Sequence, residues 1–153
     1  MKEKFVPNHL HFICRGKCLN PPQKESILDE WLTELVHIVD MNILIKPKSI
    51  YVNDEPGNEG ITGTVILTTS HASIHIWDRQ EPALLQFDIY SCAPFNPEDV
   101  IVHLQKFQLT ELQWIRIDRN DGINIIDQGE LEFLAEDYDD MKTNFDEFVK
   151  IYN

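Results

Sequence analysis

Residues 70–77 alternate between apolar and polar side chains, and this alternation limits what the centre of the chain can fold into. The apolar positions are Ala72, Ile74 and Ile76. The polar or aromatic positions are His71, Ser73, His75 and Trp77. Because successive side chains of a β-strand point to opposite faces, a period of two predicts a half-buried strand here. One face should meet the core, and the other should gather reactive side chains.

Two further strands are predicted beside this one. Residues 61–69 form the strand before it, and residues 78–82, Asp-Arg-Gln-Glu-Pro, are typical of a hairpin loop after it. The returning strand alternates Leu85, Phe87 and Ile89 with Asp88, Tyr90 and Cys92. These segments favour an antiparallel sheet, because such short connections join antiparallel neighbours.

Helix and strand signals flank this central region. Residues 21–40 carry apolar side chains at helical spacing after an Asn-Pro-Pro-Gln start, and Asn96-Pro97 opens a second helix. Further strands are predicted at residues 9–14, 42–52 and 112–119, with an exposed loop at residues 53–60.

The C-terminal region differs in composition from the rest. Residues 130–153 hold eight acidic side chains against Lys142 and Lys150. Apolar residues recur there at helical spacing: Tyr138, Met141, Phe145, Phe148, Val149 and Tyr152. The sequence therefore predicts one domain over residues 1–126 and an acidic, amphipathic helical tail over residues 127–153.

Charge and cysteine content narrow the class of protein. The chain has 13 Lys and Arg against 26 Asp and Glu, a net charge of −13, which disfavours binding to nucleic acid or to anionic membranes. Three cysteines form an odd set, no signal-peptide pattern follows Met1, and no apolar run approaches the roughly 18 to 20 residues of a membrane helix. We expect a soluble cytoplasmic protein.

The pattern Ser-His-x-x-Ile-His-x-Trp at residues 70–77, followed by Asp-Ile-Tyr-Ser-Cys at residues 88–92, resembles the active-site segment of the bacterial and archaeal S-adenosylmethionine decarboxylases. Recognisable motifs cover about residues 55–122, and the order of elements matches more loosely back to His9. The resemblance implies a two-layer α+β sandwich, with a mostly antiparallel sheet and two main helices, that pairs as a homodimer. It also implies decarboxylation of S-adenosylmethionine, which supplies the aminopropyl donor for spermidine synthesis.

The resemblance further implies a self-made pyruvoyl cofactor. The hydroxyl of Ser70 would attack the carbonyl of Thr69, converting the peptide to an ester, and elimination and hydrolysis would leave a pyruvoyl group at residue 70. Its ketone condenses with an amino acid and accepts electrons as carbon dioxide leaves. His75 and Thr62 match the family residues that assist processing, and Cys92 matches the acid that returns a proton to the substrate. In other contexts Ser70 would be a turn residue and Cys92 a buried apolar one.

Substrate contacts are expected after the second histidine. Trp77 would be an aromatic wall for the sulfonium or adenine, and Asp78 or Glu81 would bind the ribose. The family has Trp-Pro-Glu here, whereas this chain has a longer loop, and it has Thr69 where the family has Glu. No metal site is predicted, because Cys14 and Cys18 lack zinc-ligand partners at usual spacing, and His9 and His11 would make a crowded one.

Two alternatives remain open on these residues. The altered loop at residues 78–82 is compatible with a pyruvoyl-dependent decarboxylase acting on arginine or ornithine. Thr69 is compatible with an unprocessed, non-catalytic protein that binds S-adenosylmethionine or a partner protein. Intact mass distinguishes the unprocessed protein from the enzymes, and product analysis distinguishes the enzymes from each other.

Overall fold

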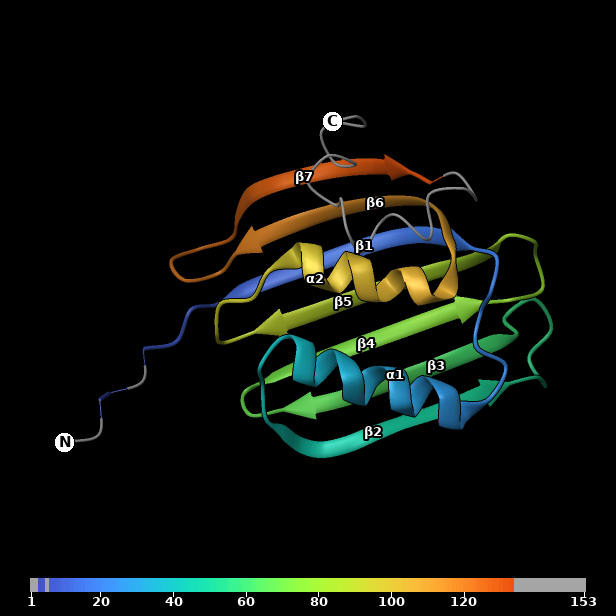
Figure 1. Ribbon diagram of the computed structural model, residues 1–153, viewed down its shortest axis with the longest axis horizontal. Helices are drawn as coiled ribbons and strands as arrows, with labels where there is room; N and C mark the ends of the chain where they lie inside the picture. The colour runs from blue at the N-terminus through green and yellow to red at the C-terminus, as the bar shows by residue number, and fades with distance from the viewer. Residues whose placement is uncertain (1–2, 5, 134–153) are drawn as a thin grey trace.

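One antiparallel sheet carries helices on a single face in the computed structural model, which describes residues 3–4 and 6–133 (Figure 1). Within these residues the sheet has seven strands in the order β2-β3-β4-β5-β1-β6-β7, and every neighbouring pair is antiparallel. The strands are β1 (Leu10–Cys18), β2 (Ile43–Val52), β3 (Gly60–Leu67), β4 (Ser70–Trp77), β5 (Ala83–Ser91), β6 (Leu109–Asp118) and β7 (Asn124–Glu132). The helical segments are α1 (Glu25–Ile38), α2 (Pro97–Leu104) and the 3₁₀ turn η1 (Gln105–Phe107). The predicted α+β fold with an antiparallel sheet and two helices is confirmed.

The core lies between the helices and one face of the sheet. Helix α1 packs on β2 and β3, and it also contacts α2. The largest fully buried side chains are Phe12, Leu28, Leu32, Leu35, Ile61, Leu67, Ile74, Ile76, Leu85, Ile89, Leu104 and Leu109. In β4 the even-numbered residues are buried, as the alternation predicts. No described helix covers the opposite face of the sheet, which we call the open face (Figure 1).

The two helices differ in how their N-termini are capped. Asn96 accepts a hydrogen bond from the Glu98 backbone N–H at 3.1 Å, so α2 begins with the predicted cap. Helix α1, in contrast, begins at Glu25 rather than residue 21, and Lys24 precedes it without a side-chain cap. The prediction for this boundary was wrong because a residue before a proline disfavours helical geometry, and Asn20 and Pro21, which each precede a proline, lie outside the helix.

Strand β7 was not predicted. It pairs with β6 from Glu111↔Glu132 to Asp118↔Asn124, so residues 127–132 belong to the sheet and not to a helical tail. Its pattern carries little alternation, since Ile125 and Ile126 are both exposed, and the pairing partner determines its conformation. The predicted acidic helix, with residues 138–152 at helical spacing, lies outside the described residues. Among the described residues, no helix is long and apolar enough to cross a membrane.

Candidate active site

A two-residue turn joins β3 to β4 and carries the predicted cleavage point. Leu67 pairs with Ser70 across the hairpin, which leaves Thr68 and Thr69 as the turn. Thr69 has φ +59°, in the left-handed region that a non-glycine residue adopts at a cost of about 1–2 kcal/mol. The peptide bond between Thr69 and Ser70 therefore follows a strained residue at an exposed turn.

Ser70 and Cys92 lie together at this turn because β4 and β5 are neighbouring strands. The Cys92 backbone N–H donates to Ser70 Oγ at 2.9 Å, and the Ser70 side chain is buried. The Thr69 hydroxyl donates to Cys92 Sγ at 3.0 Å and also to the Thr68 carbonyl at 2.8 Å. The predicted nucleophile and the predicted acid thus share one set of hydrogen bonds.

The thiol of Cys92 differs from the other two. Partial burial raises the pKa of Cys92, but hydrogen bonding by the hydroxyls of Ser70 and Thr69 outweighs it and lowers this pKa below its ordinary value. Burial raises the pKa of Cys18 to about 12 and also raises that of Cys14, so both stay protonated and inert. Cys92 is the cysteine whose environment suits acid–base chemistry.

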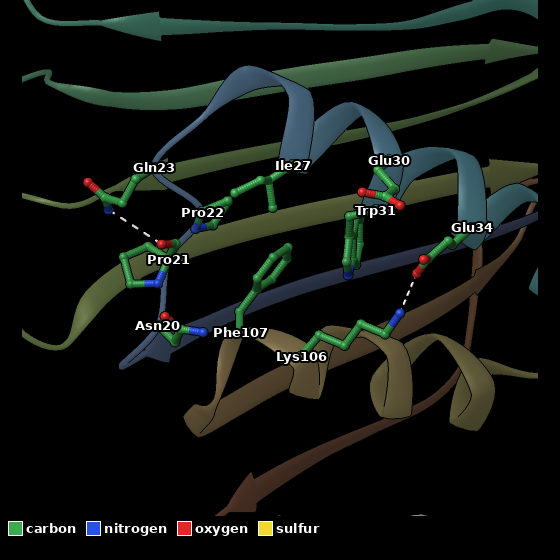
Figure 2. Close-up of a pocket in the computed structure, with 10 residues that line it drawn as sticks. All are labelled: Asn20, Pro21, Pro22, Gln23, Ile27, Glu30, Trp31, Glu34, Lys106 and Phe107. Atoms are coloured by element: carbon green, nitrogen blue, oxygen red, sulfur yellow. Dashed lines mark hydrogen bonds and ion pairs between the residues drawn. The ribbon is translucent and has the colours of Figure 1, made fainter.

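A cavity of about 460 Å³ adjoins Ser70 and Cys92. Its other lining residues are Pro7, Asp40, Met41, Asn42, Thr68, Thr69 and Ala93. Its volume falls in the range of small-molecule sites. A different cavity, of about 300 Å³, lies between α1 and η1, where Lys106 forms an ion pair with Glu34 beside Trp31 and Phe107 (Figure 2). That cavity is lined by none of the predicted site residues.

Thr62 and His75 form a second group of predicted residues. They pair across β3 and β4, and Thr62 Oγ1 lies 3.1 Å from His75 Nδ1. A cavity of about 200 Å³ borders both, together with Trp77, whose indole N–H donates to Asn58 Oδ1 at 2.9 Å. The sequence placed the imidazole of His75 near Ser70, but five residues of strand separate them by about 16 Å. Ser70 is on the helix side of β4, whereas His75 is on the open face.

The predicted ribose ligands differ in their surroundings. Both oxygens of the Asp78 carboxylate accept the Tyr51 hydroxyl, at 2.9 and 2.7 Å, and this hydrogen bond raises the pKa of Tyr51. Glu81 is exposed in the loop after β4. Asp78 follows Trp77 at the same end of β4 as His75, and the Tyr51 hydroxyl already holds its carboxylate in place. Tyr51 was missed in the sequence because an aromatic residue in a predicted strand has no pattern that marks it.

A third group of polar side chains lies on the open face. Asp88 Oδ2 accepts hydrogen bonds from His11 Nε2 at 2.8 Å and from His71 Nε2 at 3.2 Å. Beside them, His9 Nδ1 lies 2.6 Å from the Tyr90 hydroxyl. The sequence singled out His71 and Asp88 only as motif residues, because their meeting with His11 depends on the distant strand β1.

The comparisons with known proteins agree with the motif. The family model described as S-adenosylmethionine decarboxylase matches residues 14–120, which covers more than half of the chain. The chain belongs to the S-adenosylmethionine decarboxylase family. The resemblance that the motif at residues 70–77 indicated is thereby confirmed.

Relatives in this family carry the name S-adenosylmethionine decarboxylase proenzyme. The protein from Methanococcus maripaludis is 36% identical over 75 residues, 48% of this chain and 57% of the relative, so the chain matches little more than half of that protein. The Archaeoglobus fulgidus protein is 32% identical over 98 residues, 63% of this chain and 81% of the relative. The Thermoplasma acidophilum protein is 32% identical over 99 residues, 63% and 72% of the two chains.

A crystal structure of the Trypanosoma brucei AdoMetDC-delta26 monomer also matches, with a TM-score of 0.47 and 13% identity. The match covers 78% of this chain and 49% of the trypanosomal one.

Proposed function

We propose that this chain is a proenzyme that cleaves itself between Thr69 and Ser70 and then decarboxylates S-adenosylmethionine. The product is the aminopropyl donor for spermidine synthesis. The observation that carries the proposal is the meeting of Ser70 with Cys92 at the strained turn, in a chain of this family. The three cysteines form no disulfide, which fits a reducing cytoplasm.

Self-cleavage uses atoms that the turn brings together. Ser70 Oγ attacks the carbonyl carbon of Thr69, an ester forms, and the peptide C–N bond breaks as the nitrogen takes up the hydroxyl proton. Loss of the Ser70 α-proton to a base then breaks the Cβ–O bond, which leaves a carboxylate on Thr69 and a dehydroalanine at residue 70. Water replaces the amino group as ammonia leaves. Release of the left-handed strain at Thr69 favours the forward direction.

The residues around position 70 suit the pyruvoyl group that results. The backbone N–H of Cys92, now 2.9 Å from Ser70 Oγ, is placed to hold an oxygen at this position, and the adjoining cavity offers room for a substrate. When present, the group supplies the electron sink for loss of carbon dioxide. Cys92 then has the role of the acid that gives a proton to the substrate α-carbon, and a thiol with a lowered pKa suits this transfer near neutral pH.

A second copy of the chain is part of this proposal. Thr62 and His75 have the residue types that assist proton transfer during processing, yet within one chain they lie about 16 Å from Ser70 on the opposite face of the sheet. If two chains pair over their open faces about a two-fold axis, the Ser70 end of one chain meets the His75 end of the other. Trp77 and Asp78 lie at that same end and would complete the substrate site.

Intact mass after incubation at neutral pH tests the proposal. The expected products are a fragment of residues 1–69 and a blocked fragment that begins at residue 70. Ser70→Ala should remain full length while keeping its fold, because Ser70 makes its hydrogen bond at a strand end and contributes little apolar packing. A wild-type chain that stays at full length would favour the non-catalytic alternative. Carbon dioxide release from S-adenosylmethionine, arginine and ornithine, each given separately, then identifies the substrate.

A further inference from the structure

Three neighbouring strands bring two imidazoles and a carboxylate together on the open face. His11 of β1 and His71 of β4 both pair with Tyr90 of β5, and Asp88 lies two residues along β5 on the same face. One ligand atom from each of His11, His71 and Asp88 lies within 4.8 Å of the others. The three side chains are partly buried, with 18%, 44% and 30% of their surfaces exposed.

The arrangement matches the donor set of a divalent transition metal. Zinc sites with an open position use three protein ligands, and neighbouring ligand atoms about 2.0–2.1 Å from the ion are about 3.3 Å apart in tetrahedral geometry. The two nitrogens already lie 2.8 and 3.2 Å from Asp88 Oδ2.

We propose that His11, His71 and Asp88 bind one Zn²⁺ ion or a divalent cation of similar ligand preference. Nε2 of each histidine and Oδ2 of Asp88 are the ligands, and the remaining position faces away from the sheet. The ion links β1, β5 and β4 on the open face, whereas Ser70, the residue before His71, is on the helix side of β4. This site lies outside the group formed by Ser70, Thr69 and Cys92, and the proposal holds whether or not the chain cleaves itself.

Arg119 is the side chain that opposes metal binding. Its guanidinium lies over the Tyr90 ring, 4.6 Å from the centroid, and its Nη1 is 3.4 Å from His11 Nδ1. Since arginine only donates, it favours the His11 tautomer with the proton on Nε2, whereas metal binding at Nε2 requires that proton on Nδ1. Arg119→Gln removes both this bias and a nearby positive charge, so it should tighten metal binding.

Calorimetric titration of Zn²⁺ into the metal-free, full-length protein tests the site. We expect the wild-type protein to bind one Zn²⁺ ion per chain. His71→Ala and Asp88→Asn should each weaken this binding by at least about 100-fold, which is more than the loss of an outer-shell partner costs. Asp88→Asn preserves the size of the side chain, so it reports on ligation even if His71→Ala fails to fold. His37→Ala removes an exposed histidine of α1 and should leave binding unchanged.

A second probe separates this site from thiol binding. Co²⁺ bound to two imidazoles and a carboxylate gives visible absorption without a thiolate charge-transfer band. Cys92→Ser should therefore leave both the Co²⁺ spectrum and Zn²⁺ affinity unchanged. The proposal is overturned if the wild-type chain binds no Zn²⁺, if Asp88→Asn binds as tightly as wild type, or if Cys92→Ser alone abolishes binding.

Discussion

Thr69 combines two properties that bear on the chemistry of Ser70 and Cys92. Its backbone adopts φ +59°, which strains the residue before the proposed cleavage point. Its hydroxyl donates to Cys92 Sγ at 3.0 Å, a contact that stabilises the thiolate.

Thr69→Val should raise the pKa of Cys92, because valine keeps the shape of threonine and lacks the hydroxyl. The measurement is the pH dependence of iodoacetamide alkylation of Cys92, made in a Ser70→Ala background where the chain stays intact. Thr69→Ser in that background restores the donor and should restore the lower pKa. Equal alkylation profiles for the valine and threonine forms would show that the hydroxyl does not act on the thiol.

Cys92→Ala should separate processing from turnover. The Ser70 hydroxyl and the strained turn remain, and the backbone N–H of residue 92 persists, so the chain should still cleave. Loss of the acid should lower the decarboxylation rate by about 10²–10⁴, the usual contribution of a positioned acid. Mass spectrometry follows cleavage and carbon dioxide release follows turnover. Full decarboxylation with the correct product would leave Cys92 with a packing role only.

At the residue scale, the sequence could predict contacts between residues on strands that form a hairpin. Ser70 and Cys92 meet because β4 and β5 form a hairpin, and a short loop with alternating strands marks this in the sequence. His11 meets Asp88 only because β1 inserts between β5 and β6, and such a long-range order leaves no local pattern. The hydrogen bond from the Tyr51 hydroxyl to Asp78 likewise joins residues that are distant in the sequence and has no local pattern.

At the scale of elements, the two helices are joined through one reciprocal contact. The Trp31 indole N–H donates to the His103 carbonyl at 3.1 Å, and the His103 ring lies 2.9 Å from the Trp31 carbonyl. The two rings stack with centroids 4.6 Å apart. Apolar spacing predicted both helices, but it could not predict that a histidine of α2 would lie buried against α1.

This contact makes stability depend on pH. Burial lowers the pKa of His103 below its ordinary value of about 6.5, so the unfolded chain binds the proton more readily than the folded one. The contribution of neutral His103 to the free energy of unfolding is fully present above about pH 6.5. It falls as the pH decreases from there toward the lowered pKa of His103 in the folded chain. His103→Gln removes the titration, so its free energy of unfolding in urea should change less than that of wild type between about pH 7.5 and about pH 5.5. Parallel pH profiles for the two proteins would contradict this assignment.

At the scale of the whole molecule, helices on one face leave the other face of the sheet open. The alternation in β4 and β5 predicted half-buried strands, and the resemblance to the family implied the two-layer form. The sequence also named the residue types of the site, but the contacts that join Ser70 to Cys92 and Thr62 to His75 in two separate groups are seen only in the folded sheet. Strand alternation places Ser70 and His75 on opposite faces of the sheet.

Mixing two inactive variants tests whether two chains share the site. Ser70→Ala lacks the nucleophile, and His75→Ala retains Ser70 but lacks the imidazole. In a mixed dimer, the intact Ser70 of the His75→Ala chain meets the intact His75 of the Ser70→Ala chain. Unfolding the variants together and refolding them should therefore cleave up to about half of the His75→Ala chains, the share that random pairing places in mixed dimers. Separately refolded samples are the control. If mixing produces no cleavage beyond that control, His75 does not serve the Ser70 of a second chain.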